Sequence, residues 1–309
     1  MSMERKFAVG VAALLLHGWT FGARARARGR RYRTAAFGRM DRPGGGVVEV
    51  HGRRAEGAEL GVIFCNGLGL PHEQWDWVCG NLPDNVAYVR YNRPGYGLSS
   101  PLPGAPTAEE QLKVIDELRD RYLGGLPLVL AGHSLGGHLA AAYAASRTEG
   151  DVSHVVMVDP LVLGQLKALR GGPDDLWRRQ QLLIERVWAA SGLNVLRPSS
   201  PVRETYAEET RESITDFHAL PSVWATAYRE YVTAFSYPAI ARLAAPVHVV
   251  TALRTARNAE GHRRAQAGLR DLSGRFRHHV IEDADHMRVL AEETHARTVA
   301  ELIVSGGMA

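Results

Sequence analysis

A serine between two glycines is the residue in this sequence best placed to do chemistry. The apolar, strand-like run Leu128 to Ala131 leads into Gly132-His133-Ser134-Leu135-Gly136, and a helix rich in small residues follows. A serine at such a sharp strand-to-helix turn has strained backbone and an exposed hydroxyl, and side chains on either glycine would clash there. The positive end of the following helix would face negative charge on a substrate. We therefore predict that Ser134 is a nucleophile.

A nucleophilic serine needs a general base, and His286 is the candidate. It follows the strand-like run Phe276 to Ile281, in the stretch Asp283-Ala284-Asp285-His286. An imidazole suits this role because it titrates near neutral pH and can take and return a proton. The other histidines fit less well: His133 adjoins Ser134 but should point away from it, and several others fall within strand-like runs (His248, His278 and His279).

Strand-like and helix-like runs alternate from residue 31 onward, which is typical of a mainly parallel sheet covered by helices. The predicted strands are 31–38, 46–52, 60–66, 85–92, 127–133, 152–159, 246–252 and 276–282, with a hairpin turn at Gly44-Gly45-Gly46. The predicted helices are 72–81, 107–123, 136–147, 258–272 and 287–305, and Thr107 with Glu110 forms a capping box.

Residues 162–243 interrupt this alternation. They contain no strand-like run, only helical segments near 174–191, 201–216 and 221–242, together with nine aromatic residues. We predict an all-helical lid inserted after the sixth strand. The expected organisation starts with an N-terminal apolar helix and Arg-rich leader at 1–30. A core in two parts, 31–161 and 244–309, follows, and the lid at 162–243 lies between these parts.

These motifs resemble the α/β-hydrolase family, and in particular its lid-bearing members. The order of elements agrees over residues 31–305. The strand at 60–66 ends in Asn66-Gly67-Leu68-Gly69, where the family commonly has His-Gly, and the stretch Arg93 to Ser99 resembles the family's glycine-rich turn after the fourth strand. We interpret the serine and glycines of that turn as structural. The resemblance implies an eight-stranded, mainly parallel α/β sheet with flanking helices.

The resemblance also implies an oxyanion hole built from two backbone N–H groups. One belongs to the residue after the nucleophile and the other to the loop after the third strand, which here are Leu135 and Leu68. Such donors stabilise the oxyanion of a tetrahedral intermediate. Asn66 replaces the usual histidine, which leaves the donors in place but makes the loop geometry an open question.

The acid of a Ser-His-acid triad has several candidates. Most relatives carry it after the seventh strand, where Thr255 occupies the expected position and Glu260 follows. Some relatives carry it at the end of the sixth strand, where this sequence has Asp159. We favour Asp159, which preserves the order serine, acid, histidine. Glu260 is the alternative acid, and Asp283, Asp285 or no acid at all stay open.

The N-terminal segment carries the excess positive charge of the chain. The 309 residues have a net charge of +4, yet residues 1–42 alone carry ten basic and two acidic side chains, so the remainder is mildly acidic. An apolar run at 7–22 precedes arginines 24–33 and resembles a signal peptide, but dense positive charge after it favours retention in the cytoplasm. Peripheral membrane contact through residues 1–33 and a helix packed on the domain are both open.

The combined prediction is a serine hydrolase that cleaves a small to medium apolar acyl compound through an acyl-enzyme. Its predicted location is the cytoplasm, with membrane association through the N-terminal segment left open. A carboxylic ester is the expected substrate, with a thioester, an amide or a carbon–carbon bond as alternatives, and a ligand-binding protein of low or no turnover as a different class. We expect no cofactor, no metal and no nucleic-acid partner, because dinucleotide, P-loop and zinc motifs are lacking. Cys65 and Cys79 are expected to be packing residues.

Overall fold

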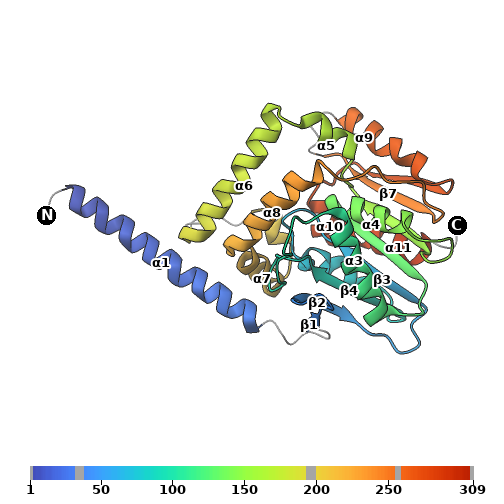
Figure 1. Ribbon diagram of the computed structural model, residues 1–309, viewed down its shortest axis with the longest axis horizontal. Helices are drawn as coiled ribbons and strands as arrows, with labels where there is room; N and C mark the ends of the chain where they lie inside the picture. The colour runs from blue at the N-terminus through green and yellow to red at the C-terminus, as the bar shows by residue number, and fades with distance from the viewer. Residues whose placement is uncertain (1–2, 32–37, 193–199, 255–258, 307–309) are drawn as a thin grey trace.

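One eight-stranded sheet forms the centre of the molecule in the computed structural model, which describes residues 3–31, 38–192, 200–254 and 259–306 (Figure 1). The strand order is β1-β2-β4-β3-β5-β6-β7-β8. β2 pairs antiparallel with β1 and β4, and the other neighbouring pairs are parallel. The strands are β1 (Gly38–Asp41), β2 (Val47–Arg53), β3 (Leu60–Cys65), β4 (Val86–Asn92), β5 (Leu128–His133), β6 (His154–Val158), β7 (Val247–Ala252) and β8 (Phe276–Ile281). The predicted fold class is confirmed.

Helices cover both faces of the sheet, which explains the unbroken apolar sequences of the central strands. In β3, Val62 and Phe64 belong to the apolar layer under α2 and α11, whereas Ile63 and Cys65 belong to the layer under α3 and α4. This alternation follows from the two-residue period of a strand. The covering helices are η1 (His72–Trp75), α2 (Asp76–Gly80), α3 (Ala108–Leu118), η2 (Arg119–Leu123), α4 (Leu135–Ala145), α9 (Ala259–Ala267), η5 (Gly268–Leu272), α10 (Arg288–Ala291) and α11 (Glu293–Ser305).

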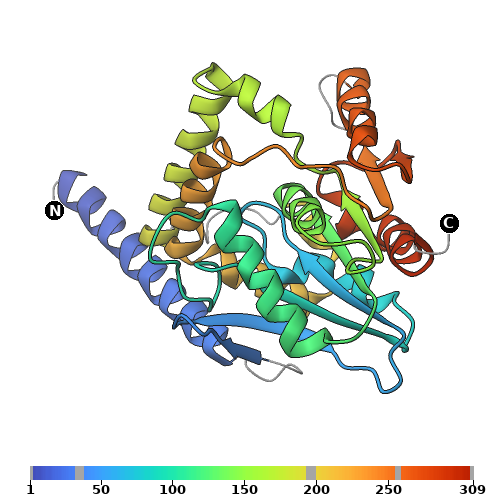
Figure 2. The ribbon, with the colours of Figure 1, turned by 45° about the vertical axis from the view of Figure 1, so that its right-hand side comes forward.

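Between β6 and β7 the described residues form helices only. They are α5 (Leu163–Leu169), α6 (Pro173–Ser191), η4 (Arg203–Thr205), α7 (Glu208–His218) and α8 (Pro221–Ala234), and we call them the helical insertion. The insertion lies between α1 and the sheet (Figure 2). Most aromatic residues between β6 and β7 pack inward, since Phe217, Tyr231, Phe235 and Tyr237 share one apolar cluster with Tyr96 and Leu139 of the core.

The N-terminal helix α1 (Met3–Arg31) extends along the insertion and projects beyond it (Figure 1). It packs against α6 and α7. At this contact the backbones approach closely, because a Cβ on Gly18 would lie 2.5 Å from the carbonyl oxygen of Ser191. No helix in the described part of the chain combines the length and the hydropathy that a membrane crossing requires.

Several local predictions are confirmed and others need correction. The Gly44–Gly46 hairpin joins β1 to β2, and the Thr107 hydroxyl caps α3 by accepting from the N–H of Glu110 at 3.3 Å. The first strand was predicted at 31–38, but α1 runs to residue 31, 32–37 lie outside the described residues, and β1 begins at residue 38. The stretch 163–169 forms a helix that its sequence did not predict, and α8 ends at 234 rather than 242.

Both cysteines fit the packing role that was expected of them. Cys65 and Cys79 are buried, unpaired thiols in the two apolar layers of the sheet. Burial raises the pKa of each thiol to about 12. A thiol with so high a pKa is protonated at neutral pH and is therefore a poor nucleophile.

Candidate active site

Ser134 occupies a tight turn between β5 and α4. Its backbone has φ 54° and ψ −120°, outside the regions that residues other than glycine normally adopt. The flanking glycines allow this turn: a Cβ on Gly132 would lie 2.3 Å from the carbonyl oxygen of Gly136, and one on Gly136 would lie 2.1 Å from that of Cys65. The structure therefore has the strained strand-to-helix turn that the sequence motif predicts, with Ser134 at its tip.

Backbone hydrogen bonds hold the strained residue from both sides. The N–H of Ser134 donates to the carbonyl of Val158 at the end of β6, at 3.0 Å. The carbonyl of Ser134 accepts from the N–H of Gly137 at 3.0 Å and from that of Leu161 at 2.9 Å. Leu161 leads into the helical insertion, so the turn is tied to the neighbouring strand and to the start of the insertion.

Asp159 and His286 lie in direct contact, although 127 residues separate them. The Oδ2 atom of Asp159 is 2.6 Å from Nδ1 of His286. Its other oxygen, Oδ1, is 2.8 Å from Nε2 of His262 on α9 and accepts from the N–H of Ala252 at 3.2 Å. Three partners thus fix the carboxylate, and the bond to Nδ1 leaves Nε2 of His286 available for other partners.

The buried Asp159 carboxyl is held in its charged form. Burial acts to raise its pKa, but hydrogen bonds from His262 and His286 outweigh burial and hold that pKa well below its usual value. The hydrogen bond between Asp159 and His262 raises the pKa of His262, against the effect of burial. Asp159 also has a φ of 40°, so it and Ser134 are the non-glycine residues with positive φ in the described part of the chain.

His133 lies beneath His286, with ring centroids 4.6 Å apart. Its Nε2 is 2.8 Å from the carbonyl oxygen of His286, which places the ring proton on that nitrogen. Burial is the main reason why the pKa of His133 falls to about 3, so this ring stays neutral. His133 therefore supports the backbone at His286, and nothing places it as a second base.

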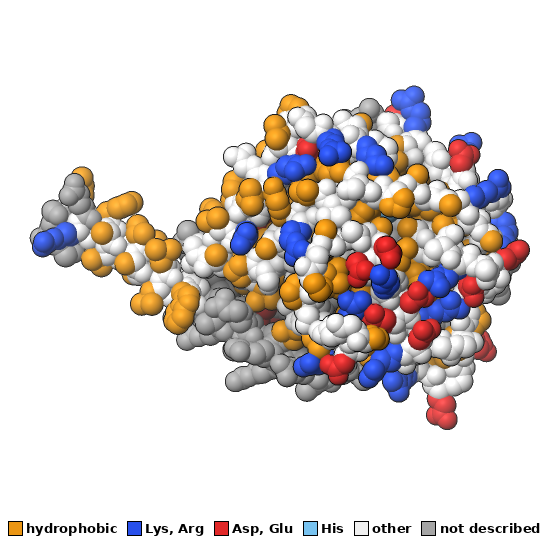
Figure 3. All heavy atoms as spheres, viewed as in Figure 1, with side chains coloured by type: hydrophobic (Ala, Val, Ile, Leu, Met, Phe, Trp, Pro, Cys, Tyr) orange, Lys and Arg blue, Asp and Glu red, His pale blue; other side chains and the backbone are white. Residues whose placement is uncertain are grey.

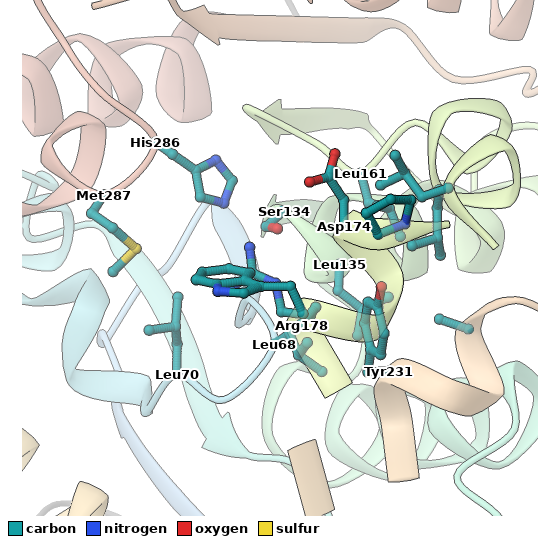
Figure 4. Close-up of a pocket in the computed structure, with 15 residues that line it drawn as sticks. Leu68, Leu70, Ser134, Leu135, Leu161, Asp174, Arg178, Tyr231, His286 and Met287 are labelled. Atoms are coloured by element: carbon teal, nitrogen blue, oxygen red, sulfur yellow. The ribbon is translucent and has the colours of Figure 1, made fainter. Parts of the chain in front are cut away.

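Ser134 and His286 open onto a cavity of about 930 Å³ (Figure 4). Leu68 and Leu135, the residues expected to supply the oxyanion donors, line the same cavity. The remaining lining is mostly apolar and comes largely from the insertion (Leu70, Leu161, Leu166, Leu169, Pro173, Asp174, Trp177, Arg178, Tyr231, Ala234 and Met287). The cavity volume is that of a small-molecule site.

The other acid candidates lie elsewhere. Glu260 is at the start of α9, its side chain is 65% exposed, and it pairs with Arg264 at 3.5 Å. Asp285 accepts from the backbone N–H groups of Met287 and Arg288, so it caps α10. Asp283 is exposed and lies 3.3 Å from His295. Thr255 lies outside the described residues. Of the proposed acids, the structure brings Asp159 into hydrogen-bond contact with His286.

A buried ion pair connects the loop after β3 to the insertion. The guanidinium of Arg93 forms two bonds to the Glu230 carboxylate on α8, Nε to Oε1 at 2.7 Å and Nη2 to Oε2 at 2.8 Å. Arg93 also donates to the carbonyl oxygens of Asn66 and Gly67. Leu68, a predicted oxyanion donor, directly follows these two carbonyl groups. We call the interaction of Arg93 with Glu230 and the two carbonyl groups the Arg93 clamp.

Two further side chains complete the clamp. The hydroxyl of Tyr96 donates to Oε2 of Glu230 at 2.7 Å and accepts from the N–H of Gly69 at 3.3 Å. The amide of Gln111 donates to Oε1 of Glu230 at 3.1 Å. Asn66, which stands in place of the usual histidine, is fully buried. Its amide nitrogen donates to the carbonyl of Tyr91, and its amide oxygen accepts from the indole N–H of Trp75. Its side chain therefore supports the loop from below.

The sequence reasoning did not find His262, Arg93 or Glu230. Arg93 stood inside a turn that we interpreted as structural, and that interpretation holds for Ser99, whose hydroxyl bonds the backbone of Asn92 and Glu49. Glu230 interrupts the apolar face of a predicted helix, which could have signalled a buried partner. His262 carried no signal, because its partner lies 103 residues away.

Comparison with known proteins agrees with the fold. Residues 62–302 match the model of a family described as the alpha/beta hydrolase family. Among solved structures, the Cif epoxide hydrolase from Acinetobacter nosocomialis is 14% identical, with a TM-score of 0.70 over 92% of this chain and 95% of that one. A membrane phospholipase A described as a bacterial virulence factor is 17% identical, with a TM-score of 0.62 over 99% of this chain and 97% of that one. At these identities the likeness shows the fold.

A curated relative matches a shorter region. Protein YqjL of Bacillus subtilis strain 168, described as uncharacterized, is 24% identical over 115 residues. The match spans 37% of this chain and 45% of YqjL, so this chain covers less than half of that relative's length.

The raised pKa of His262 predicts a pH-dependent contribution to stability. A histidine whose pKa is raised in the fold stabilises it most at pH values below the unfolded pKa of about 6.5, and this contribution falls as pH rises through the folded value. His262→Gln should therefore lower the free energy of unfolding more at pH 6 than at pH 9, measured by urea denaturation. His278→Gln is the control, since burial lowers the pKa of His278 and the dependence should reverse. Equal losses for His262→Gln at both pH values would contradict a charged His262.

The Arg93 clamp predicts a large cost for removing one of its charges. Glu230→Gln leaves the buried Arg93 guanidinium without a counter-charge, so we expect a loss of about 3–5 kcal/mol in the free energy of unfolding. Urea denaturation measures it. The matched control is Glu282→Gln, which breaks an exposed pair with Arg263 and should change stability by less than about 0.5 kcal/mol. Similar losses in the two variants would show that the clamp adds no more than a surface ion pair.

Proposed function

Because this chain belongs to the alpha/beta hydrolase family and carries a serine at the tip of its strained turn, we propose that it is a serine hydrolase that forms an acyl-enzyme. One observation carries the proposal: the Asp159–His286 hydrogen bond of 2.6 Å lies at the cavity that Ser134 also lines. The serine also argues against the reaction of epoxide hydrolases that use a carboxylate nucleophile, although proteins of that activity share the fold.

In the proposed reaction the Ser134 hydroxyl attacks the carbonyl carbon of the substrate. Nε2 of His286 takes the hydroxyl proton and passes it to the leaving alcohol, and Asp159 stabilises the imidazolium that forms in between. The N–H groups of Leu68 and Leu135 stabilise the oxyanion. Water then attacks the acyl-enzyme while Nε2 of His286 accepts a water proton. The imidazolium returns this proton to the departing Ser134 oxygen, which releases the acid and the free serine.

The substrate we propose is a carboxylic ester with a small to medium apolar acyl group. The support is the lining of the cavity, in which leucines from the core and the insertion surround Ser134 (Figure 4). Apolar walls bind an acyl chain through the burial of its surface. A thioester or a carbon–carbon bond beside a carbonyl would use the same groups, so the ester is the first member of this class to test.

A fluorophosphonate probe tests the nucleophile directly. We expect the wild-type chain to be labelled at one serine and Ser134→Ala to remain unlabelled, with mass spectrometry locating the adduct. On p-nitrophenyl esters of graded chain length, Asp159→Asn should lower kcat about 10⁴-fold, because the carboxylate that orients and stabilises His286 is lost. Glu260→Gln is the matched control and should retain wild-type turnover.

The outcomes separate the enzyme from its alternatives. An unlabelled wild type, or equal labelling of Ser134→Ala, would overturn the serine hydrolase and favour a ligand-binding protein. If Glu260→Gln is inactive and Asp159→Asn is active, the acid of the triad is Glu260 and not Asp159. Labelling without hydrolysis of any ester in the series would point to another acyl bond.

We also propose that residues 1–33 bind an anionic membrane surface. Figure 3 shows hydrophobic side chains along α1, and those exposed by 40% or more include Met3, Phe7, Val9, Val11, Leu14, Leu15, Leu16 and Trp19. The neighbouring α6 exposes Leu176, Trp177, Leu183 and Val187, and Trp177 also lines the cavity. Apolar side chains followed by arginines suit an anionic lipid interface.

Sedimentation with vesicles tests this contact. The full chain should bind vesicles that contain phosphatidylserine more strongly than neutral phosphatidylcholine vesicles, and added salt should weaken the binding. Phe7→Asp with Trp19→Asp should reduce binding at least tenfold. Val280→Asp is the control, because Val280 is a partly exposed apolar residue on the distant edge strand β8. Equal binding of both variants would overturn the proposed surface.

A further inference from the structure

Four buried titratable side chains lie together behind the loop that follows β3. Glu49 and His51 project from the same face of β2, and His72 and Glu73 begin η1. Their exposed fractions are 7%, 4%, 0% and 5%, respectively. None of them lines the cavity at Ser134. The cluster is therefore separate from the catalytic groups, and the proposed reaction does not use it.

The atoms of this cluster are spaced for an ion. Oε1 of Glu49 is 3.6 Å from Nε2 of His51 and 3.8 Å from Nε2 of His72, so both imidazoles face the same carboxylate oxygen. One ligand atom from each of these three residues lies within 4.8 Å of the others. Ligand atoms around a tetrahedral ion with bonds of 2.0–2.2 Å lie about 3.4 Å apart. Small side-chain shifts would therefore allow the three atoms to coordinate one ion.

The surrounding groups orient the three side chains. Oε2 of Glu49 accepts from the amide of Asn92 and from the N–H of Leu98, each at 2.8 Å, which turns Oε1 toward the two imidazoles. On the far side of the His72 ring, Nδ1 is 3.4 Å from Oε2 of Glu73. A carboxylate behind a histidine fixes its tautomer and leaves the other nitrogen as a ligand, as outer-shell carboxylates do in metal sites.

Unpartnered buried atoms point to the same place. Both ring nitrogens of His72 and Oε2 of Glu73 are fully buried and lack a hydrogen-bond partner. Buried polar atoms rarely stay unpaired, because each costs about 1–3 kcal/mol. A divalent cation on Nε2 of His72 would satisfy that nitrogen and would draw the Nδ1 proton toward Glu73. It would also balance the charges of Glu49 and Glu73.

We propose that Glu49, His51 and His72 form a binding site for a divalent transition metal, with Zn²⁺ as the best-matched ion. Two imidazole nitrogens and a carboxylate oxygen are ligands that Zn²⁺ takes readily. The role of the ion is structural. It joins β2 to η1, whose first N–H already donates to Asn92 at 3.0 Å, and it thereby braces the loop that carries Leu68. This proposal differs from the expectation of no metal that was drawn from the sequence. The sequence carries no signal for this site, because ligands from two separate elements form no local motif.

Metal content and metal binding test the site. The full chain, purified without a histidine tag from zinc-supplemented medium, should contain about one zinc per chain by elemental mass spectrometry. After chelation, Zn²⁺ or Co²⁺ should rebind with the same stoichiometry and raise the unfolding temperature, and bound Co²⁺ should show the visible absorption of a low-coordinate nitrogen and oxygen site. The proposal does not rest on the serine hydrolase, since ester turnover is not the readout.

Two variants and a control locate the ion. His72→Gln and Glu49→Gln should each lower the zinc content at least tenfold and abolish the metal-dependent rise in unfolding temperature. His279→Gln should keep both, although His279 and His248 form another histidine pair, with nitrogens 3.2 Å apart. If a variant fails to fold, the wild-type Co²⁺ spectrum still decides. A wild type that binds none of Zn²⁺, Co²⁺ or Mn²⁺, or zinc lost only in His279→Gln, would overturn the site.

Discussion

The buried pair of Arg93 and Glu230 is the interaction on which the shape of the candidate site depends. Arg93 belongs to the turn after β4 and Glu230 to α8, yet their bonds also fix the carbonyl groups of Asn66 and Gly67. Three parts of the chain that are remote in sequence thus meet at one guanidinium. Taking both charges out of water is costly, and the cost is offset only because every partner is in place. The pair therefore favours one arrangement of the loop and the insertion over others.

The ends of β5 and β6 carry the backbone strain of the site. Ser134 and Asp159 follow these neighbouring parallel strands, and both have positive φ values. Each is held by a strand: Ser134 donates to Val158, and the N–H of Asp159 donates to Val250 at 2.6 Å. Strain of this kind persists where the surroundings over-determine it, and it commonly occurs at functional positions. The central sheet thus supports unfavourable backbone at the candidate nucleophile and at the candidate acid.

Much of this architecture could be predicted from the sequence, because its signals are local. Apolar runs and glycine positions located most strands and the Ser134 turn, and the order serine, acid, histidine favoured Asp159, which contacts His286 in the structure. The catalytic roles themselves stay predictions. What local reasoning could not find are partners that only the tertiary fold brings together: His262, the Arg93 clamp, and the Glu49, His51 and His72 cluster. The helix at 163–169 was missed because short segments depend on tertiary packing more than on propensity.

The hydrogen bond from the N–H of Leu161 to the carbonyl of Ser134 has a consequence for how such a protein diversifies. It anchors the first residue of the chain leading into the insertion to the backbone of the serine itself, while Glu230 anchors the last helix of the insertion. Between these two fixed points, α5 and α6 supply many of the cavity walls, and α5, α6 and α7 carry none of the triad candidates. A change of sequence in α5 or α6 would consequently reshape the pocket while Ser134, Asp159 and His286 keep their positions.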